Sequence, residues 1–363
     1  MNTRLRTVFC MKKTMWDILS GKSITAGVES MTRTLIYKNP VWVRARASAV
    51  GPKESEGPLG DLFDIRHTED LLGCESWELA ESALIRECVQ LCMEKGGVAR
   101  GQLGAMLSGD LLNQLMASGF AARDLGEPFL GMYGACSTFL ESTLAGAALV
   151  DGGYRENVIV SASSHFCTAE RQFRYPLEMG TQRPPSGQWT CTAAGAMLLD
   201  SGKTPGKIRV ECATLGRVVD YQVTDANHMG AAMAPAAFDT LQAHLQDMGR
   251  EIMDYDAIVT GDLGWIGREL LMELCSRSGM KFDKERFIDC GNSVFYREQD
   301  PHAGGSGCGC VASVTCAWIL SRVESGEWKR ALVIGTGAML SVASTQQKQS
   351  IPCIAYAASF EGV

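Results

Sequence analysis

One of the 14 cysteines, Cys136, has a sequence context that could support nucleophilic chemistry. It follows a Gly-Ala turn in the stretch YGACST, residues 133–138, and begins a run of small and apolar residues that ends at Gly152. This run predicts a buried helix that starts at the cysteine. Backbone N–H groups at a helix N-terminus favour negative charge, so they would lower the pKa of the thiol or bind an anion, and Ser137 adds a hydroxyl. Alternatively, Cys136 is a small side chain kept for packing.

The other cysteines favour packing over metal binding or disulfides. They are scattered through apolar segments, which is typical of reduced thiols in a core. Cys308 and Cys310 form a C-x-C pair among glycines without a second pair at zinc-site spacing, so the sequence predicts no metal site. Asp110 and Asp262, each expected at a strand end, are interpreted either as turn caps or as calcium-coordinating carboxylates.

Composition limits the class of protein. With 363 residues, of which 46% are hydrophobic, the chain can bury a large core. The net charge of -7, with dispersed Lys and Arg, argues against a nucleic-acid partner. We see no apolar run near the roughly 20 residues that cross a bilayer. Residues 1–34 are interpreted as an N-terminal extension, and Met31 is a candidate start of translation.

An internal repeat indicates the architecture. The segment GAMLSGDL, residues 104–111, is echoed by DAIVTGDL, residues 256–263, and each follows a predicted helix, Trp77–Lys95 or Ala236–Gly249. In the same way, Cys136 and Cys310 each begin an apolar stretch with an aromatic residue 18 positions later. Alternating strands and helices predict an α/β fold with parallel strands, right-handed crossovers and helices on both faces. The turn-rich segment DSGKTPGK separates two predicted halves, residues 35–203 and 204–363.

Several longer motifs resemble a known family. The stretch LVIGTGAM, residues 332–339, is similar to the C-terminal thiolase signature, and HAGGSG, residues 302–307, is similar to the histidine-containing glycine turn of thiolases. More specific are GPKESEGPLGDLFD, SGDLLNQ, YGACST, SSHFCTAERQFRYP, MGAAMAPAAFDT and AGGSGCGC. Together, over Leu35 to Phe360, the chain resembles the stage V sporulation protein AD family of the thiolase-like superfamily. This resemblance implies two duplicated αβ halves stacked as a five-layered α-β-α-β-α sandwich.

The resemblance also implies a function. Members of the family are expected to be soluble, non-enzymatic spore proteins that bind dipicolinic acid, pyridine-2,6-dicarboxylate, with calcium as an optional companion of the ligand and no other cofactor. They are expected to support uptake of this acid during sporulation and its release in germination. Expected partners are the other SpoVA proteins at the spore inner membrane, which would hold the protein peripherally on the forespore side, and a second copy in a homodimer.

The catalytic groups of the wider superfamily are largely replaced. The resemblance aligns Val333 with the acid-base cysteine of thiolases, and valine cannot transfer a proton. Gly261 and Asp262 align where ketoacyl synthases have a histidine that stabilises the oxyanion. His302 is the remaining candidate partner, so Cys136 and His302 are interpreted as vestigial catalytic residues. The alternative is an active thiolase or ketoacyl-synthase type of acyltransferase that uses Cys136, with His302 or His165 as its base.

A planar dianion requires cationic and N–H donors, and arginine binds carboxylates in a bidentate manner. In the resembling fold, the segment after the strand that leaves the Cys136 helix covers the pocket. From this segment we predict His165, Arg171 and Arg174 as ligand contacts, together with Cys136 and Ser137. In the structural alternative, Glu170 pairs with one of the arginines and the loop has no ligand.

Overall fold

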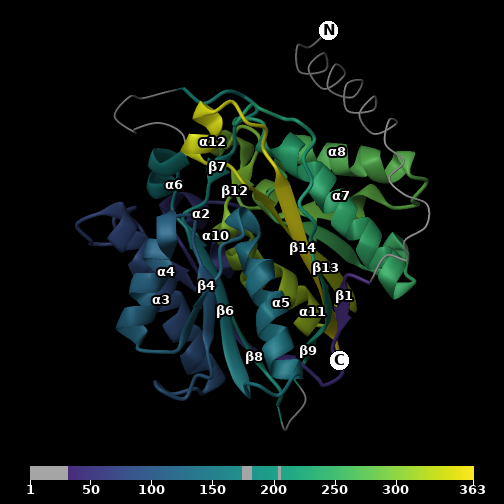
Figure 1. Ribbon diagram of the computed structural model, residues 1–363. Helices are drawn as coiled ribbons and strands as arrows, with labels where there is room; N and C mark the ends of the chain where they lie inside the picture. The colour runs from purple at the N-terminus through teal and green to yellow at the C-terminus, as the bar shows by residue number, and fades with distance from the viewer. Residues whose placement is uncertain (1–31, 174–181, 203–205) are drawn as a thin grey trace.

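The computed structural model describes residues 32–173, 182–202 and 206–363. The extension up to residue 31 and the predicted boundary at residues 203 and 204 lie outside these ranges. Within the described ranges, the main sheet has the order β11-β10-β13-β14-β9-β2-β8-β6-β4-β5, and β1 and β3 pair with β9 and β2 (Figure 1). We find that none of the described helices is long and apolar enough to cross a membrane.

The bounds of the elements are as follows. The strands are β1 (Thr34–Ile36), β2 (Trp42–Val50), β3 (Ile65–Arg66), β4 (Met106–Gly109), β5 (Phe129–Gly131), β6 (Asn157–Ser164), β7 (Trp189–Thr190), β8 (Ala193–Asp200), β9 (Ile208–Thr214), β10 (Ala257–Thr260), β11 (Phe287–Asp289), β12 (Gly305–Ser306), β13 (Arg330–Ala338) and β14 (Cys353–Gly362). The α-helices are α2 (Pro52–Ser55), α3 (Trp77–Gly96), α4 (Met116–Leu125), α5 (Thr138–Asp151), α6 (Phe166–Phe173), α7 (Met229–Met248), α8 (Gly264–Arg277), α9 (Cys290–Ser293), α10 (Cys308–Val314), α11 (Leu320–Glu324) and α12 (Val342–Gln346). Short 3-10 turns include η3 (Ala135–Ser137) and η5 (Ile252–Asp254), and the π turn η8 (Thr315–Ile319) joins α10 to α11.

The sheet repeats one strand order. It reads β5-β4-β6-β8-β2 on one side and β11-β10-β13-β14-β9 on the other. In each set the first three strands are parallel, whereas β8 and β14 run antiparallel to both neighbours. The sequence predicted parallel strands only, which is wrong for β8 and β14. The connections after β6 and β13 return the chain at the same end of the sheet, and this makes the next strand antiparallel.

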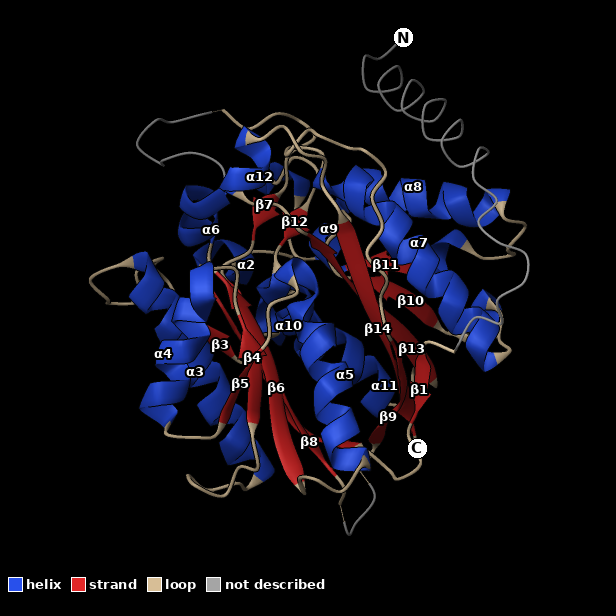
Figure 2. Cartoon of the chain, viewed as in Figure 1, coloured by secondary structure: helices blue, strands red, loops and turns tan. Residues whose placement is uncertain are grey.

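Helices form three layers around the two sets of strands. Helices α3 and α4 cover the outer face of the first set, and α7 and α8 cover the outer face of the second. Between the sets lie α5, which packs against β6 and β13, and α10, which packs against β8 (Figure 2). The five-layered α/β arrangement expected from the sequence is therefore confirmed, and it buries the central helices on nearly all sides.

Helices α3 and α7 show how well local sequence signals predict where a helix starts and ends. The first predicted helix, Trp77–Lys95, matches α3, which Ser76 caps at its start and the left-handed Gly97 ends. The predicted start of the second at Ala236 is wrong, because α7 begins at Met229 and contains Pro235. Proline usually breaks a helix by removing an N–H donor, but here burial of the surrounding small residues keeps the helix intact.

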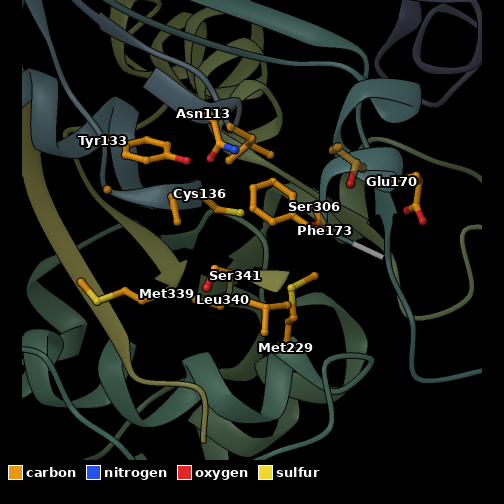
Figure 3. Close-up of a pocket in the computed structure, with 16 residues that line it drawn as sticks. Asn113, Tyr133, Cys136, Glu170, Phe173, Met229, Ser306, Met339, Leu340 and Ser341 are labelled. Atoms are coloured by element: carbon orange, nitrogen blue, oxygen red, sulfur yellow. The ribbon is translucent and has the colours of Figure 1, made fainter. Parts of the chain in front are cut away.

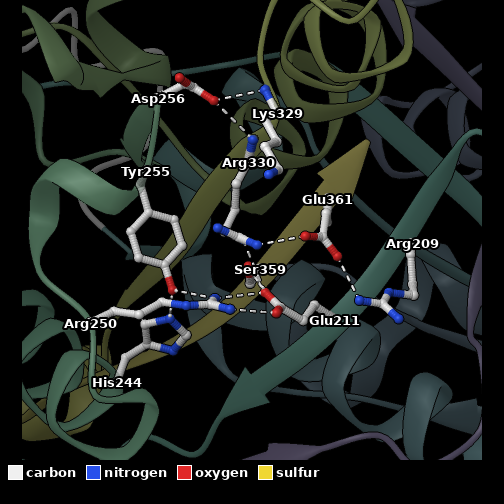
Figure 4. Close-up of polar contacts among 10 residues, drawn as sticks. All are labelled: Arg209, Glu211, His244, Arg250, Tyr255, Asp256, Lys329, Arg330, Ser359 and Glu361. Carbon is white, nitrogen blue, oxygen red and sulfur yellow. Dashed lines mark hydrogen bonds and ion pairs between the residues drawn. The ribbon is translucent and has the colours of Figure 1, made fainter. Parts of the chain in front are cut away.

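An ion-pair network ties β9, β13 and β14 together near the start of β13 (Figure 4). Glu211 accepts two hydrogen bonds from Arg250, at 2.8 and 2.6 Å, and Glu361 accepts from Arg330 at 2.5 Å and from Arg209 at 2.6 Å. Burial opposes ionisation of Glu211, but the neighbouring arginines hold its pKa at about 2. These contacts fix the ends of the strands that lie away from the candidate site.

Candidate functional site

A cavity of about 400 Å³ lies where parallel strands of both sets end, which is the usual position of ligand sites in open α/β sheets. Figure 3 shows Tyr133 and Cys136 on one side of it, Met339 to Ser341 on the opposite side, and Glu170 on α6 at one end. The lining consists of Leu111, Asn113, Tyr133, Gly134, Ala135, Cys136, Ala169, Glu170, Phe173, Thr190, Met229, Ser306, Ala338, Met339, Leu340 and Ser341.

A strained turn presents Cys136 to the cavity. Ala135 adopts a left-handed backbone with φ of 53°, which costs a non-glycine residue roughly 1–3 kcal/mol. A Cβ added at Gly134 would lie 2.6 Å from Glu141 Oε2 and 2.8 Å from Ser137 Oγ, so these two side chains would have to shift. Ser137 Oγ donates to Gly134 O at 2.6 Å and is fully buried, so it stabilises the turn and does not line the cavity. The turn places Cys136 just before α5, as the sequence predicted.

The Cys136 thiol is held in its protonated form. Burial raises its pKa well above the usual value, and the Asp262 carboxylate, to which the thiol donates a hydrogen bond, raises it further. Our expectation that the helix N-terminus would lower this pKa is therefore wrong. The favourable N–H groups are outweighed because the thiol is desolvated and faces an acid instead of a cation.

Asp262 joins elements of the second half beneath the cavity. It is fully buried, and its carboxylate accepts hydrogen bonds from Thr336 Oγ1 at 2.7 Å and from the Gly307 N–H at 3.1 Å. Burial raises the pKa of Asp262, and these hydrogen bonds oppose the shift. Asp110, after β4, accepts from the Leu112 and Ser118 N–H groups at 2.8 and 2.7 Å, so it caps a turn. We find no cluster of three or more metal-binding side chains within the described ranges.

Two predicted ligand contacts lie outside the cavity lining. His165 is fully buried; its Nε2 donates to Asp70 O at 2.8 Å and its Nδ1 accepts from the Cys167 N–H at 3.1 Å. Both ring nitrogens are thus occupied, and burial lowers the pKa of the imidazole. Arg171 lies on the outer face of α6, where it pairs with Glu78.

Nothing tests one of the two remaining predicted residues, and the other, His302, is not in the described lining. Arg174 lies outside the described residues. The Nδ1 of His302 hydrogen-bonds to Pro184 O at 2.8 Å, and its Nε2 lies 3.0 Å from Asp300. His302 is therefore engaged elsewhere, and the lining formed by the described residues contains no histidine that could serve Cys136 as a base.

The sequence analysis missed most of the polar groups of the cavity. Tyr133, Asn113 and Ser341 were not proposed, and Glu170 was considered only as an ion-pair partner. A signal existed on α6, because Ala169, Glu170 and Phe173 are spaced to share one helix face and all three line the cavity. The same spacing places Arg171 on a different face.

The electrostatic character of the lining differs from that expected for a dianion. The described lining contains no lysine or arginine, and Glu170 is its one carboxylate. Burial raises the pKa of Tyr133, which keeps its hydroxyl protonated at neutral pH. The donors that the described lining offers to a carboxylate are therefore neutral groups, namely the hydroxyls, the Asn113 amide and backbone N–H groups at the start of α5.

Comparison with known proteins gives a consistent result. The sequence profile described as stage V sporulation protein AD (SpoVAD) matches residues 31–361. Stage V sporulation protein AD of Bacillus subtilis strain 168 is 41% identical over 329 residues, which cover 91% of this chain and 96% of that protein.

Several solved structures have a similar fold. A variant of OleA from Xanthomonas campestris has a TM-score of 0.59 at 14% identity, covering 92% of this chain and 99% of that chain. The 3-oxoacyl-acyl-carrier-protein synthase III of Aquifex aeolicus VF5 has a TM-score of 0.57 at 9% identity, covering 88% and 99%. At these identities the similarity establishes the thiolase-like fold alone.

Proposed function

The chain belongs to the stage V sporulation protein AD family, and from this membership and the cavity chemistry we propose that it acts in sporulation as a binding protein for dipicolinic acid. The acid binds free or together with calcium. Binding supports uptake of the acid into the developing spore and its release in germination.

The observation that carries this proposal is the environment of Cys136. Its thiol lines a cavity but is kept protonated by burial and by Asp262, and the described lining offers it no histidine base. A nucleophile needs the thiolate form, so these groups favour contact with a ligand over turnover. The protein is accordingly a non-enzymatic member of a fold that serves catalysis elsewhere.

The cavity also suits a ligand of this size. Its volume of about 400 Å³ lies within the range for small-molecule sites, and a planar ring can pack between apolar groups such as Phe173 and Leu340. The two carboxylates would then meet neutral donors, among them Tyr133, Asn113 and Ser306. Calcium bound by the ligand would find oxygen atoms in Glu170 and the hydroxyls.

Calorimetric titration of the full chain with dipicolinate, with and without millimolar calcium, tests the proposal. We expect binding by the native protein and a loss of at least about tenfold in affinity in Met229→Trp, because the indole fills the cavity. Met253→Trp is the matched control, since Met253 is exposed on η5 and lies outside the lining. Absence of binding in both calcium conditions would contradict the proposed function.

An acyltransferase is the second candidate, because the Cys136 thiol reaches the cavity from the N-terminus of a buried helix, as a condensing-enzyme nucleophile does. Mass spectrometry after incubation with acyl-CoA separates the two functions. An acyl adduct on Cys136 that forms and then turns over would establish the enzyme; its absence is expected.

We further propose that the protein associates peripherally with the spore inner membrane through the other SpoVA proteins. Its acidic composition, with a net charge of -7, disfavours direct binding to anionic lipid. Co-purification with those proteins from detergent-solubilised spore membranes is expected, together with no binding to protein-free anionic vesicles. Binding to protein-free vesicles without co-purification with the SpoVA proteins would contradict association through protein partners.

A further inference from the structure

A second cavity, of about 280 Å³, opens on the outer surface of the first half between helices α3 and α4. In Figure 2 these helices lie on the outer face of the first set of strands, whereas α5 lies between the two sets. Apolar side chains of both helices line this outer groove, namely Leu79 and Ala83 of α3 and Phe120 of α4. Leu79 is 38% exposed, so the outer groove is open to solvent. It shares no described lining residue with the cavity at Cys136.

The charged residues on the α3 side of the outer groove lie at its two ends. Leu79, Ala83 and Arg86 follow one another at intervals of four and three positions, so they share one face of α3. At 1.5 Å per residue, Leu79 and Arg86 lie about 10 Å apart along the helix axis. Glu75 precedes Ser76, the N-cap of α3, and therefore lies beyond Leu79, at the end opposite to Arg86.

Positive charge is in excess at the Arg86 end. Arg86 Nη1 lies 3.3 Å from Asp124 Oδ2, and Arg123 Nη2 lies 2.8 Å from Asp124 Oδ1, so two guanidinium groups share one carboxylate. Arg100 adds a third guanidinium group, which donates to Asp124 O at 3.0 Å. Each guanidinium has five N–H donors, and no other carboxylate of the described residues pairs with Arg86 or Arg123. The remaining donors of these exposed side chains can therefore bind the carboxylate of a partner.

Negative charge is uncompensated at the other end. Glu75 is exposed and forms no ion pair with another described residue. The outer groove is thus negative at Glu75, apolar at Leu79 and Phe120, and positive at Arg86 and Arg123. An occupant with charges of one sign would be repelled at one end, so the pattern favours a segment that carries both signs.

We propose that the outer groove docks a short segment of a partner protein that presents a basic side chain, an apolar side chain and a carboxylate in this order. The carboxylate contacts Arg86 and Arg123, the apolar side chain packs on Leu79 and Phe120, and the basic side chain contacts Glu75. The cavity volume lies below the usual range of small-molecule sites, which favours one anchored side chain over a separate ligand. In an extended segment, about three to five residues span this length. Docking needs no ligand at Cys136, so it does not depend on the function proposed for that cavity.

Alkylation of Cys74, resolved by mass spectrometry, tests the docking site. This half-buried thiol lines the outer groove, and the half-buried Cys167, outside it, is the control thiol. The probe is the blocked peptide Lys-Gly-Leu-Gly-Asp, titrated against the full chain. We expect the alkylation rate of Cys74 to fall with the occupied fraction, by about tenfold at a peptide concentration ten times the dissociation constant. The rate at Cys167 should not change.

Three further peptides test the chemistry of the occupant. Replacing the leucine by serine removes the apolar anchor, and the peptides Asp-Gly-Leu-Gly-Asp and Lys-Gly-Leu-Gly-Lys each carry one sign of charge. Each should need at least about tenfold more peptide for the same protection, because one contact is lost or becomes repulsive. Equal protection by all four peptides, or none by the first at millimolar concentration, would overturn the proposal.

Surface variants test the polarity of the outer groove. Glu75→Lys should reverse the preference, so that the doubly acidic peptide protects Cys74 better than the mixed one. Arg123→Met should weaken protection by the mixed peptide about tenfold, whereas Arg217→Met, at an exposed arginine elsewhere, should not. An unchanged preference in Glu75→Lys would contradict the assigned ends. Protection should persist in Met229→Trp, whose cavity at Cys136 is filled, so failure of dipicolinate binding would leave the docking site standing.

Discussion

Both halves of the chain place an aspartate after the middle strand of three parallel strands, but the two carboxylates have different partners. Asp110, after β4, accepts from Leu112 and Ser118 within its own half. Asp262, after β10, accepts from Thr336 and Gly307, and also accepts from the Cys136 thiol of the other half. The two halves thus share the strand and the turn, but only the second carboxylate lies beneath the cavity and contacts a residue of the other half.

Helices α3 and α7 also correspond in the two halves but differ in one buried residue. Helices α3 and α7 both have 20 residues and end at a left-handed glycine, and the fifth residue of each is fully buried. In α3 this residue is Glu81, whereas in α7 it is Met233. Burial and the neighbouring Asp110 raise the pKa of Glu81 to about 8. The first half therefore contains a buried acid pair that involves its outer helix, whereas the buried acid near Asp262 in the second half is Asp289, at the end of β11.

The largest expected effect comes from removing either aspartate. Asp262→Ala and Asp110→Ala should each lower the free energy of unfolding by roughly 3–5 kcal/mol, because buried donors lose their acceptor. Urea denaturation measures this. Only Asp262→Ala should also speed alkylation of Cys136, by about tenfold for each unit by which the thiol pKa falls.

If the alanine variants do not fold, the two asparagine variants allow the same comparison of Cys136 alkylation. Asp262→Asn should accelerate alkylation of Cys136, and Asp110→Asn should not. Equal acceleration in both variants would mean that the two carboxylates act on the thiol in the same way, against the difference drawn here.

The acid pair predicts a pH effect on stability, and the buried Glu54 and Asp289, whose pKa values are raised to about 8 and about 6, add to it. Glu81 has a raised pKa in the folded protein, about 8, so the folded state holds a proton that the unfolded chain releases above about pH 4.5. The free energy of unfolding should therefore fall as pH rises from about 4.5 to about 8, by at most about 1.4 kcal/mol per pH unit for this group.

Glu81→Gln should reduce the slope of that dependence by the contribution of Glu81, measured by urea denaturation at several pH values. The amide retains an acceptor for Thr168, whose hydroxyl donates to Glu81 at 2.7 Å in the native protein. Glu75→Gln, at an exposed position, is the matched control. A native slope in Glu81→Gln would show that the proton is held elsewhere.

The fold was more predictable from sequence than the site. The repeated Gly-Asp-Leu segments and small-residue helices predicted a duplicated α/β fold, because strand and helix periodicity are local properties. Antiparallel β8 and β14 were missed, since strand direction depends on where a connection returns. The start of α7 was misplaced because Pro235 is tolerated within a helix packed among buried small residues.

Site residues were harder because their directions depend on tertiary packing. Cys136 was correctly placed at a helix start, and it lines the cavity. His165 and Arg171 were chosen by residue type and nearness in sequence, but the buried His165 turns toward Asp70 and the helix periodicity turns Arg171 outward. Their role as ligand contacts, like that of Arg174, stays a prediction. The desolvation that keeps Cys136 protonated has no local sequence signal.

The turn before α5 offers a smaller, more local perturbation. Gly134→Ala would bring a Cβ to 2.6 Å from Glu141 Oε2 and 2.8 Å from Ser137 Oγ, so we expect a loss of roughly 1–3 kcal/mol in stability and weaker dipicolinate binding. Gly119→Ala on α4 is the matched control, because its Cβ would meet no atom within 4 Å. It should stabilise the helix slightly. Unchanged binding in a folded Gly134→Ala protein would show that the turn does not position the site.

The two edge strands of the sheet give the last and smallest contrast. In β5, Phe129 and Leu130 are 39% and 49% exposed, whereas Phe287 of the equivalent β11 is 2% exposed. An exposed apolar edge strand is a template for pairing, so we propose that two copies of the chain pair through β5 as a homodimer. Leu130→Lys should raise the dimer dissociation constant about tenfold, or by about 1.4 kcal/mol, in sedimentation equilibrium. Ile36→Lys on β1, at a residue 60% exposed, is the control. A charge on an edge strand opposes dimerisation only if that strand forms the contact. An equal change of the dimer dissociation constant in both variants would therefore show that the contact lies on a different surface.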